Sequence, residues 1–158
     1  MVEQADSDTI RYGGLTGSLG FLLRLSQLAS FRDFYDELGP LGIRPGEISV
    51  LTVIGLNPGI RQGVLARHLM IKRAHMTKVV RALDDAGLIA RRVPADDKRA
   101  VELSLTAKGQ ARMREVHAPF AAHEKASTGP LTAREEAELK RLLRKYLDLP
   151  APDGEGSR

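Results

Sequence analysis

A change in hydrophobic period after residue 86 limits the folds open to this chain more than any other feature. Apolar residues recur at helical spacing in three successive segments, at residues 45–56, 60–70 and 73–86. From residue 88 the pattern becomes short and strand-like, with an apolar stretch on either side of a charged turn at residues 94–100. The order predicts a helix, a short helix, a third helix and a two-stranded hairpin.

Longer helices are predicted on both sides of this unit. A pattern without Pro covers residues 15–38, and its apolar residues extend well beyond half of the circumference. At ~1.5 Å per residue this helix would be about 36 Å long, and a helix so apolar needs cover on more than one side. Two further helices are expected, one after Thr106 and one after the capping box of Thr132 and Glu135. The apolar excess of the first helix predicts burial against a partner chain.

The composition excludes several kinds of site. The 158 residues contain no Cys, which excludes disulfides, thiolate metal sites and cysteine nucleophiles. No apolar run approaches the roughly 20 residues of a membrane helix, and residues 1–8 are too acidic and polar for a secretory signal. These features predict a cytoplasmic protein without a membrane partner.

Positive charge is concentrated in the middle of the chain. Residues 61–114 contain thirteen Lys and Arg against five Asp and Glu, whereas the rest of the chain contains eleven against fifteen. A basic middle between acidic flanks is typical of a surface that binds a polyanion. A solvated charged face would explain the charge alone equally well. The positions of the cations in the predicted fold are therefore needed to distinguish the two interpretations.

The predicted order of elements is that of a winged helix-turn-helix. We therefore expect a mainly α fold with a small β-hairpin wing. The second helix of a helix-turn-helix lies in the major groove, with its N-terminal residues nearest the base edges. Its side chains can donate to guanine, contact the thymine methyl group or bind a phosphate. The residues predicted to contact DNA from this helix are Lys72, Arg73, His75, Thr77 and Lys78, with Arg81 placed for a phosphate.

The tip of the hairpin supplies a second predicted contact. A narrow minor groove concentrates negative potential, so an Arg on a thin loop can insert there. Lys98 and Arg99 stand at that tip. Asp97 would oppose phosphate binding if it faced DNA, and we expect it to brace the loop by pairing with Arg92 or Arg99.

The ordered set of motifs resembles the MarR family of transcription regulators. The resemblance covers about residues 15–147, through the run Ile71–Leu83, Gly87-Leu88-Ile89, the wing residues 96–100 and the junction 105–109. It implies a homodimer that binds a palindromic operator in double-stranded DNA, without a cofactor. The implied organisation is a flexible N-terminus (1–14), a helical dimerisation region (15–44 and 107–149), a DNA-binding winged helix-turn-helix (45–106) and a flexible tail (150–158).

One residue departs from the family pattern. Arg61 stands where many members begin the short helix with Ser or Thr. The change removes a capping hydroxyl and makes a cation available, so Arg61 joins the predicted DNA contacts.

MarR-like regulators are usually repressors that a small anionic or aromatic molecule releases from DNA. The chain also resembles the branch that answers to hydroxycinnamates or their coenzyme A thioesters. Cations beside aromatic rings can hold a carboxylate and an aryl group together. The predicted effector-binding residues are Phe21, Arg24, Leu28, Phe31 and Arg32 on the first helix. Salt bridges across the dimer, or side chains whose charged ends lie in solvent, would account for Arg24 and Arg32 equally well.

Other function classes have less support in the sequence. His68, His117 and His123 are expected to be surface residues and not metal ligands. Asp96 and Asp97 adjoin, so their side chains diverge, and no nucleophile or glycine-rich phosphate motif appears; the chain is therefore not expected to be an enzyme. A winged helix that binds a protein instead of DNA remains the alternative.

Overall fold

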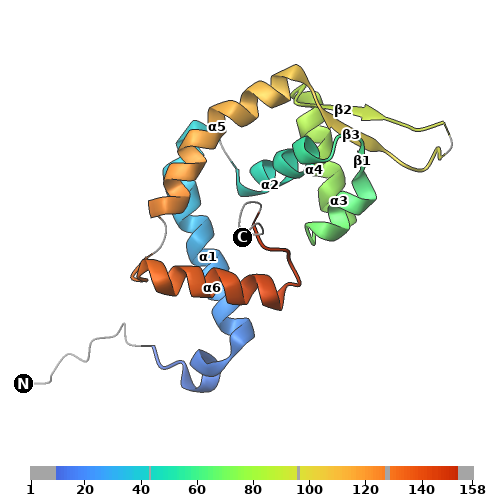
Figure 1. The fold of residues 1–158 in the computed structure, drawn as a ribbon. Helices are drawn as coiled ribbons and strands as arrows, with labels where there is room; N and C mark the ends of the chain where they lie inside the picture. The colour runs from blue at the N-terminus through green and yellow to red at the C-terminus, as the bar shows by residue number, and fades with distance from the viewer. Residues whose placement is uncertain (1–9, 43, 96, 127–128, 153–158) are drawn as a thin grey trace, which may run out of the picture.

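The structure is mainly helical, with a small sheet that projects from one end (Figure 1). This computed structural model describes residues 10–42, 44–95, 97–126 and 129–152. The elements are η1 (Gly13–Gly17), α1 (Leu19–Leu38), η2 (Gly39–Leu41), α2 (Pro45–Leu56), β1 (Ile60–Arg61), α3 (Gln62–His68), α4 (Arg73–Asp85), β2 (Ile89–Arg92), β3 (Glu102–Leu105), α5 (Ala107–Ala126) and α6 (Ala133–Tyr146). The predicted fold class is confirmed. Among the described residues, no helix combines the length and the apolarity that crossing a bilayer requires.

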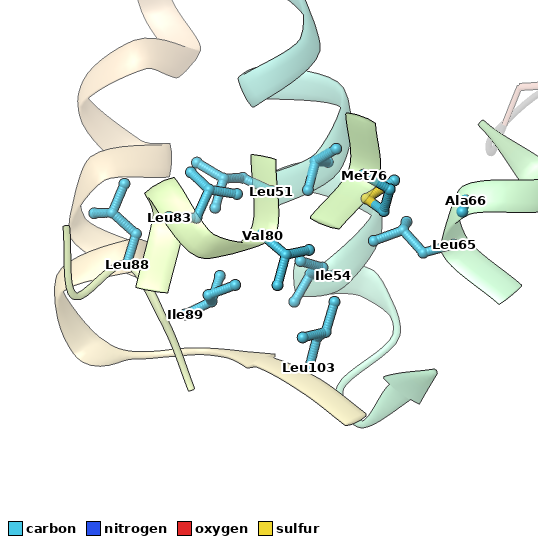
Figure 2. Close-up of a cluster of buried hydrophobic side chains, with 11 residues drawn as sticks. Leu51, Ile54, Leu65, Ala66, Met76, Val80, Leu83, Leu88, Ile89 and Leu103 are labelled. Carbon is cyan, nitrogen blue, oxygen red and sulfur yellow. The ribbon is translucent and has the colours of Figure 1, made fainter. Parts of the chain in front are cut away.

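The main core lies between α2, α3, α4 and the sheet. Figure 2 shows Leu51 and Ile54 of α2, Met76 and Val80 of α4, and Leu103 of β3 among side chains that point toward one another. All five are almost fully buried. Burying side chains of this size contributes about 1.5–3 kcal/mol each to folding. This core fixes the buried side of α4 and thereby determines which side faces outward.

The sheet has three strands, one more than the sequence predicted. β2 and β3 form the expected hairpin, with Ile89 opposite Leu105. β1 pairs with the other edge of β3, and Ile60 lies opposite Leu103. The prediction of a helix from residue 60 was therefore wrong at its start, because hydrogen bonding to β3 outcompetes the first helical turn.

The first long helix also begins later than predicted. Residues 13–17 form the short η1, and Ser18 adopts an extended conformation before α1 begins at Leu19. Three glycines between residues 13 and 17 weaken helical propensity there, which explains the late start. The helix then continues to Leu38 as expected.

A close contact joins the start of α5 to the segment between α4 and β2. Thr106 donates its hydroxyl to the Gly87 carbonyl (2.7 Å) and accepts the Gly109 amide (3.0 Å). A β-carbon at Gly109 would lie only 2.0 Å from the Leu88 carbonyl oxygen. Only a glycine therefore allows α5 to approach the chain at the start of β2 this closely.

A second, smaller cluster holds α1, α2 and α5 together. Phe34 and Leu38 of α1 pack there with Ile48 of α2 and Val116 of α5. Elsewhere on α1 and α6 large apolar side chains are exposed in the single chain. They are Leu19, Leu22, Leu25, Leu28, Phe31 and Tyr35 on α1, and Leu139, Leu142 and Tyr146 on α6.

Candidate nucleic-acid interface

One side of α4 is buried and the opposite side carries the predicted reading residues. Met76, Val80 and Leu83 anchor the helix in the core. The predicted DNA contacts from this helix and its N-cap, Lys72, Arg73, His75, Thr77, Lys78 and Arg81, are all exposed. The helix ends at Asp85, and Gly87 follows its C-cap with a φ of +70°, which suits a glycine. The Gly87 amide donates to the Asp84 carbonyl, and the Leu88 amide donates to the Leu83 carbonyl.

Two of these predicted contacts have partners within the chain. Arg81 lies 3.9 Å from Asp85, and both side chains are largely exposed, so the pair is weak. The Thr77 hydroxyl donates to the Arg73 carbonyl (3.0 Å) and accepts from the Gln62 amide (3.3 Å). Thr77 therefore has its methyl group left to offer a base edge.

Gln62 is a residue that the sequence analysis missed. It begins α3, its backbone amide bonds the Val101 carbonyl, and its side chain meets Thr77 on the reading helix. A glutamine amide can bond adenine in the major groove. Nothing in the sequence places the start of α3 beside the middle of the next helix, so no local pattern could have shown this contact.

Ion pairs on both faces stiffen the wing. Arg92 donates twice to Glu102 across the hairpin, at 3.0 and 2.7 Å. Arg91 lies 3.4 Å from Asp84 and links β2 to the last turn of α4. The wing is thereby joined to the reading helix as well as to its own partner strand.

Asp97 contacts one of its two predicted partners, Arg99, through the backbone, and it pairs with an unpredicted side chain, that of Arg61. One carboxylate oxygen accepts the backbone amide of Arg99 (3.1 Å) and the other lies 3.3 Å from the Arg61 guanidinium. The side chain that pairs with Asp97 is thus Arg61, whereas Arg92 is engaged with Glu102. The side chains of Lys98 and Arg99 are exposed.

A cleft of about 620 Å³ separates the wing from the helix-turn-helix. Arg61, Arg73, Thr77, Asp97 and Arg99 all line it, so the structure brings together half of the predicted interface. Arg67 and Gln62 line it too, although neither was predicted. Lys72, His75, Lys78, Arg81 and Lys98 are not among the lining residues. Guanidinium groups around one cleft present several donors to an anion such as a phosphate.

The chain is similar in sequence and in fold to known proteins. The MarR family model matches residues 43–101. A putative transcriptional regulatory protein for the hcr operon of Thauera aromatica is 32% identical over 152 residues, covering 93% of this chain and 92% of the relative. The chain belongs to the MarR family.

Solved structures agree with that assignment. The transcriptional repressor CouR bound to a 23-mer DNA duplex has a TM-score of 0.79 and 31% identity, covering 87% of this chain and 98% of CouR. The MarR family protein Rv2887 of Mycobacterium tuberculosis, in complex with p-aminosalicylic acid, has a TM-score of 0.65 and 31% identity, covering 82% and 98%. Proteins of the MarR family are DNA-binding regulators and not enzymes, as predicted for this chain.

The predicted effector residues share one face of α1 in this MarR-family chain. Phe21 is half-buried and its ring lies 5.9 Å from that of Tyr12. Arg24, Leu28, Phe31 and Arg32 are exposed, and Arg32 lies 3.4 Å from Asp33. None of the five lines the cleft beside the wing, so an effector site on α1 stays a prediction.

His123 differs from its predicted surface position. It is buried on α5, its ring nitrogen Nδ1 lies 2.7 Å from the Glu37 carboxylate, and its ring meets the Phe34 ring edge-on. His68 and His117 are exposed as expected. Within the described part of the chain, no three His, Cys, Asp or Glu residues gather as a metal site.

Proposed function

We propose that this chain is a homodimeric repressor that binds a palindromic operator, with α4 in the major groove and the wing in the adjacent minor groove. The observation that carries the proposal is the cationic, outward side of α4 beside the exposed Arg99 of the wing. The three-stranded sheet joins the wing to β1, and Arg91 of β2 lies 3.4 Å from Asp84 in the last turn of α4. The cytoplasm is the proposed site of action.

Each predicted contact then has a chemical role. Lys72, Arg73 and Lys78 donate to guanine or to phosphate, and His75 donates or accepts at a base edge. Thr77 offers its methyl group to thymine, since its hydroxyl is engaged within the chain. Arg81 and Lys98 bind phosphates, whose contacts fix the register without reading sequence.

Selection from random duplexes tests this proposal directly. Duplexes that the purified chain retains should share an inverted repeat with half-site centres about 10 base pairs apart, the spacing of one helical turn. A protein-interaction module on the same fold would enrich no duplex, and that result would overturn the proposal.

Lys78→Ala should weaken operator binding by about tenfold and relax the base preference at one position of each half-site. Lys78 is exposed in the second turn of α4, and a good base contact contributes about 1–3 kcal/mol of discrimination. The measurement is anisotropy titration against the operator and its single-base variants. An equal loss on every sequence would make Lys78 a phosphate contact instead.

The dimerisation region is proposed to comprise residues 15–44 and 107–149, with residues 45–106 as the DNA-binding region. The proposal is supported by the exposed apolar side chains on α1 and α6, because contact between such side chains and water is unfavourable. An interface that covers them would bury many of the large apolar side chains that are exposed in the single chain.

Sedimentation should therefore report about twice the 17.3 kDa chain mass at micromolar concentration. Leu142→Glu should shift the equilibrium toward monomer without unfolding the chain, because Leu142 is 47% exposed in the protomer. Arg134→Glu, in the first turn of the same helix, is the matched control and should leave the dimer intact. A wild-type monomer at every concentration would refute the proposed dimer.

The proposed effector is a small aromatic acid, such as a hydroxycinnamate or its coenzyme A thioester, bound near Phe21, Arg24, Leu28, Phe31 and Arg32. Its support is the pairing of cations and rings on one face of α1 and the aromatic acid in the complex of the relative Rv2887. Adding the acid should release operator DNA from the wild-type chain. The Arg24→Ala variant should need a higher concentration of the acid for the same release. Release that is unaffected by Arg24→Ala would place the ligand elsewhere.

A further inference from the structure

The cleft beside the wing contains a charge that opposes DNA binding. Four arginines line it, and among the lining residues in the described part of the chain Asp97 is the one carboxylate. This inference rests on the proposed function: with α4 in the major groove and the wing in the adjacent minor groove, the cleft between them would face the phosphate backbone. A negative charge on that surface repels phosphates unless a nearby cation neutralises it.

The two oxygens of Asp97 have separable tasks. Oδ1 accepts the backbone amide of Arg99 and thereby shapes the turn at the wing tip. Oδ2 faces the Nη1 atom of Arg61 at 3.3 Å. The first contact needs only an acceptor oxygen, whereas the second also cancels the charge.

Arg61 is held where it can perform this second task. Arg61 lies opposite Glu102 in the sheet, and the backbone amide of the next residue, Gln62, donates to the Val101 carbonyl. The backbone of Arg61 is therefore fixed beside the wing. The Arg61 and Asp97 side chains are 48% and 40% exposed, and pairs this exposed contribute little to folding stability. The pair therefore has a larger effect on the electrostatic potential of the cleft than on the fold.

We propose that Arg61 is the internal counter-ion of Asp97, a positioning residue that promotes DNA binding through Asp97 and not by contacting a phosphate. Asp97 fixes the wing tip that presents Arg99, and Arg61 removes the electrostatic cost of placing that carboxylate at the DNA surface. This assigns Arg61 a different role from the phosphate contact that its charge first suggests.

A double-mutant cycle tests the assignment. Arg61→Gln should weaken operator binding by about tenfold per dimer, because two carboxylates then face DNA uncompensated. Asp97→Asn keeps the oxygen that accepts the Arg99 amide and removes the charge, so affinity should stay within about threefold of wild type. The double variant Arg61→Gln/Asp97→Asn should recover nearly all of the lost affinity. Arg61→Lys, which keeps the cation, should behave nearly as wild type.

The salt dependence of binding supplies a second readout. Removing a direct phosphate contact lowers the slope of log affinity against log salt by about one per contact. The double variant should keep the wild-type slope. Arg67→Gln is the matched control, since Arg67 lines the same cleft. It should lower operator affinity by the same factor in the wild-type chain and in the Asp97→Asn variant.

The outcomes separate this inference from the proposed function. Equal losses for Arg61→Gln in both backgrounds, with a lower salt slope, would show that Arg61 contacts DNA directly and would overturn the inference. Thermal melts of each variant verify that the fold is intact. Failure of the wild-type chain to bind any operator would instead count against the proposed function.

Discussion

Replacing Gly109 by alanine should strongly destabilise the fold of this chain. The added β-carbon would stand 2.0 Å from the carbonyl oxygen of Leu88, and that neighbour is backbone, which cannot rotate away. Relief requires α5 to move away from Leu88, which breaks the Thr106 contact to Gly87. We expect a loss of at least about 3 kcal/mol, a large part of the stability of a typical domain. Chemical denaturation followed by circular dichroism measures it.

Gly46→Ala is the matched control for this substitution. Gly46 lies in the first turn of α2, and nothing would come within 4 Å of its β-carbon. Alanine there should stabilise the chain by about 0.5 kcal/mol, because it reduces the freedom of the unfolded state. If Gly109→Ala melted like wild type, the close approach of α5 to the Leu88 backbone would be wrong.

Arg99→Ala should weaken operator binding by about 30-fold per dimer while leaving the melting temperature unchanged. Its side chain is exposed at the wing tip, and the contact it makes with Asp97 uses the backbone amide, which alanine retains. On the proposed mode of binding, the loss comes from the missing guanidinium in the minor groove. Anisotropy titration of the operator measures the affinity.

A control and a base-composition test make this prediction specific. Arg134→Ala on α6 removes the same charge outside the proposed DNA-binding region and should change affinity little. Replacing A·T pairs under the wing by G·C pairs should weaken wild-type binding more than it weakens Arg99→Ala binding. Unchanged affinity for Arg99→Ala would remove the wing from the mechanism.

The parts of the fold that depend on local patterns were predictable. The predicted capping box of Thr132 and Glu135 is present, with the Glu135 side chain 2.8 Å from the Thr132 amide. These hydrogen bonds also lower the pKa of Glu135, since they favour the ionised carboxylate. The predicted third helix, residues 73–86, agrees with α4 to within one residue, because its apolar spacing and Gly87 determine both its buried face and its end.

The features that the sequence did not reveal depend on residues far apart in the chain. β1 has two residues, too few for any period to be visible, and exists because β3 has a free edge beside it. The pairing of Asp97 with Arg61 spans 36 positions, and sequence proximity favoured Arg92 or Arg99 instead. The burial of His123 likewise depends on Glu37, 86 positions away. Most of the predicted DNA contacts were chosen for their charge, whereas their partners within the chain required the structure.

Binding to the region upstream of its own gene is the most direct test of the account. At low salt the purified wild-type chain should shift a fragment of that region, with at least about 1,000-fold preference over unrelated DNA of equal length. Affinity should fall steeply as salt is raised, since several phosphates are contacted. A folded protein that shifts no such fragment, or that shifts unrelated DNA equally well, would contradict the claim that α4 and the wing together read a DNA sequence.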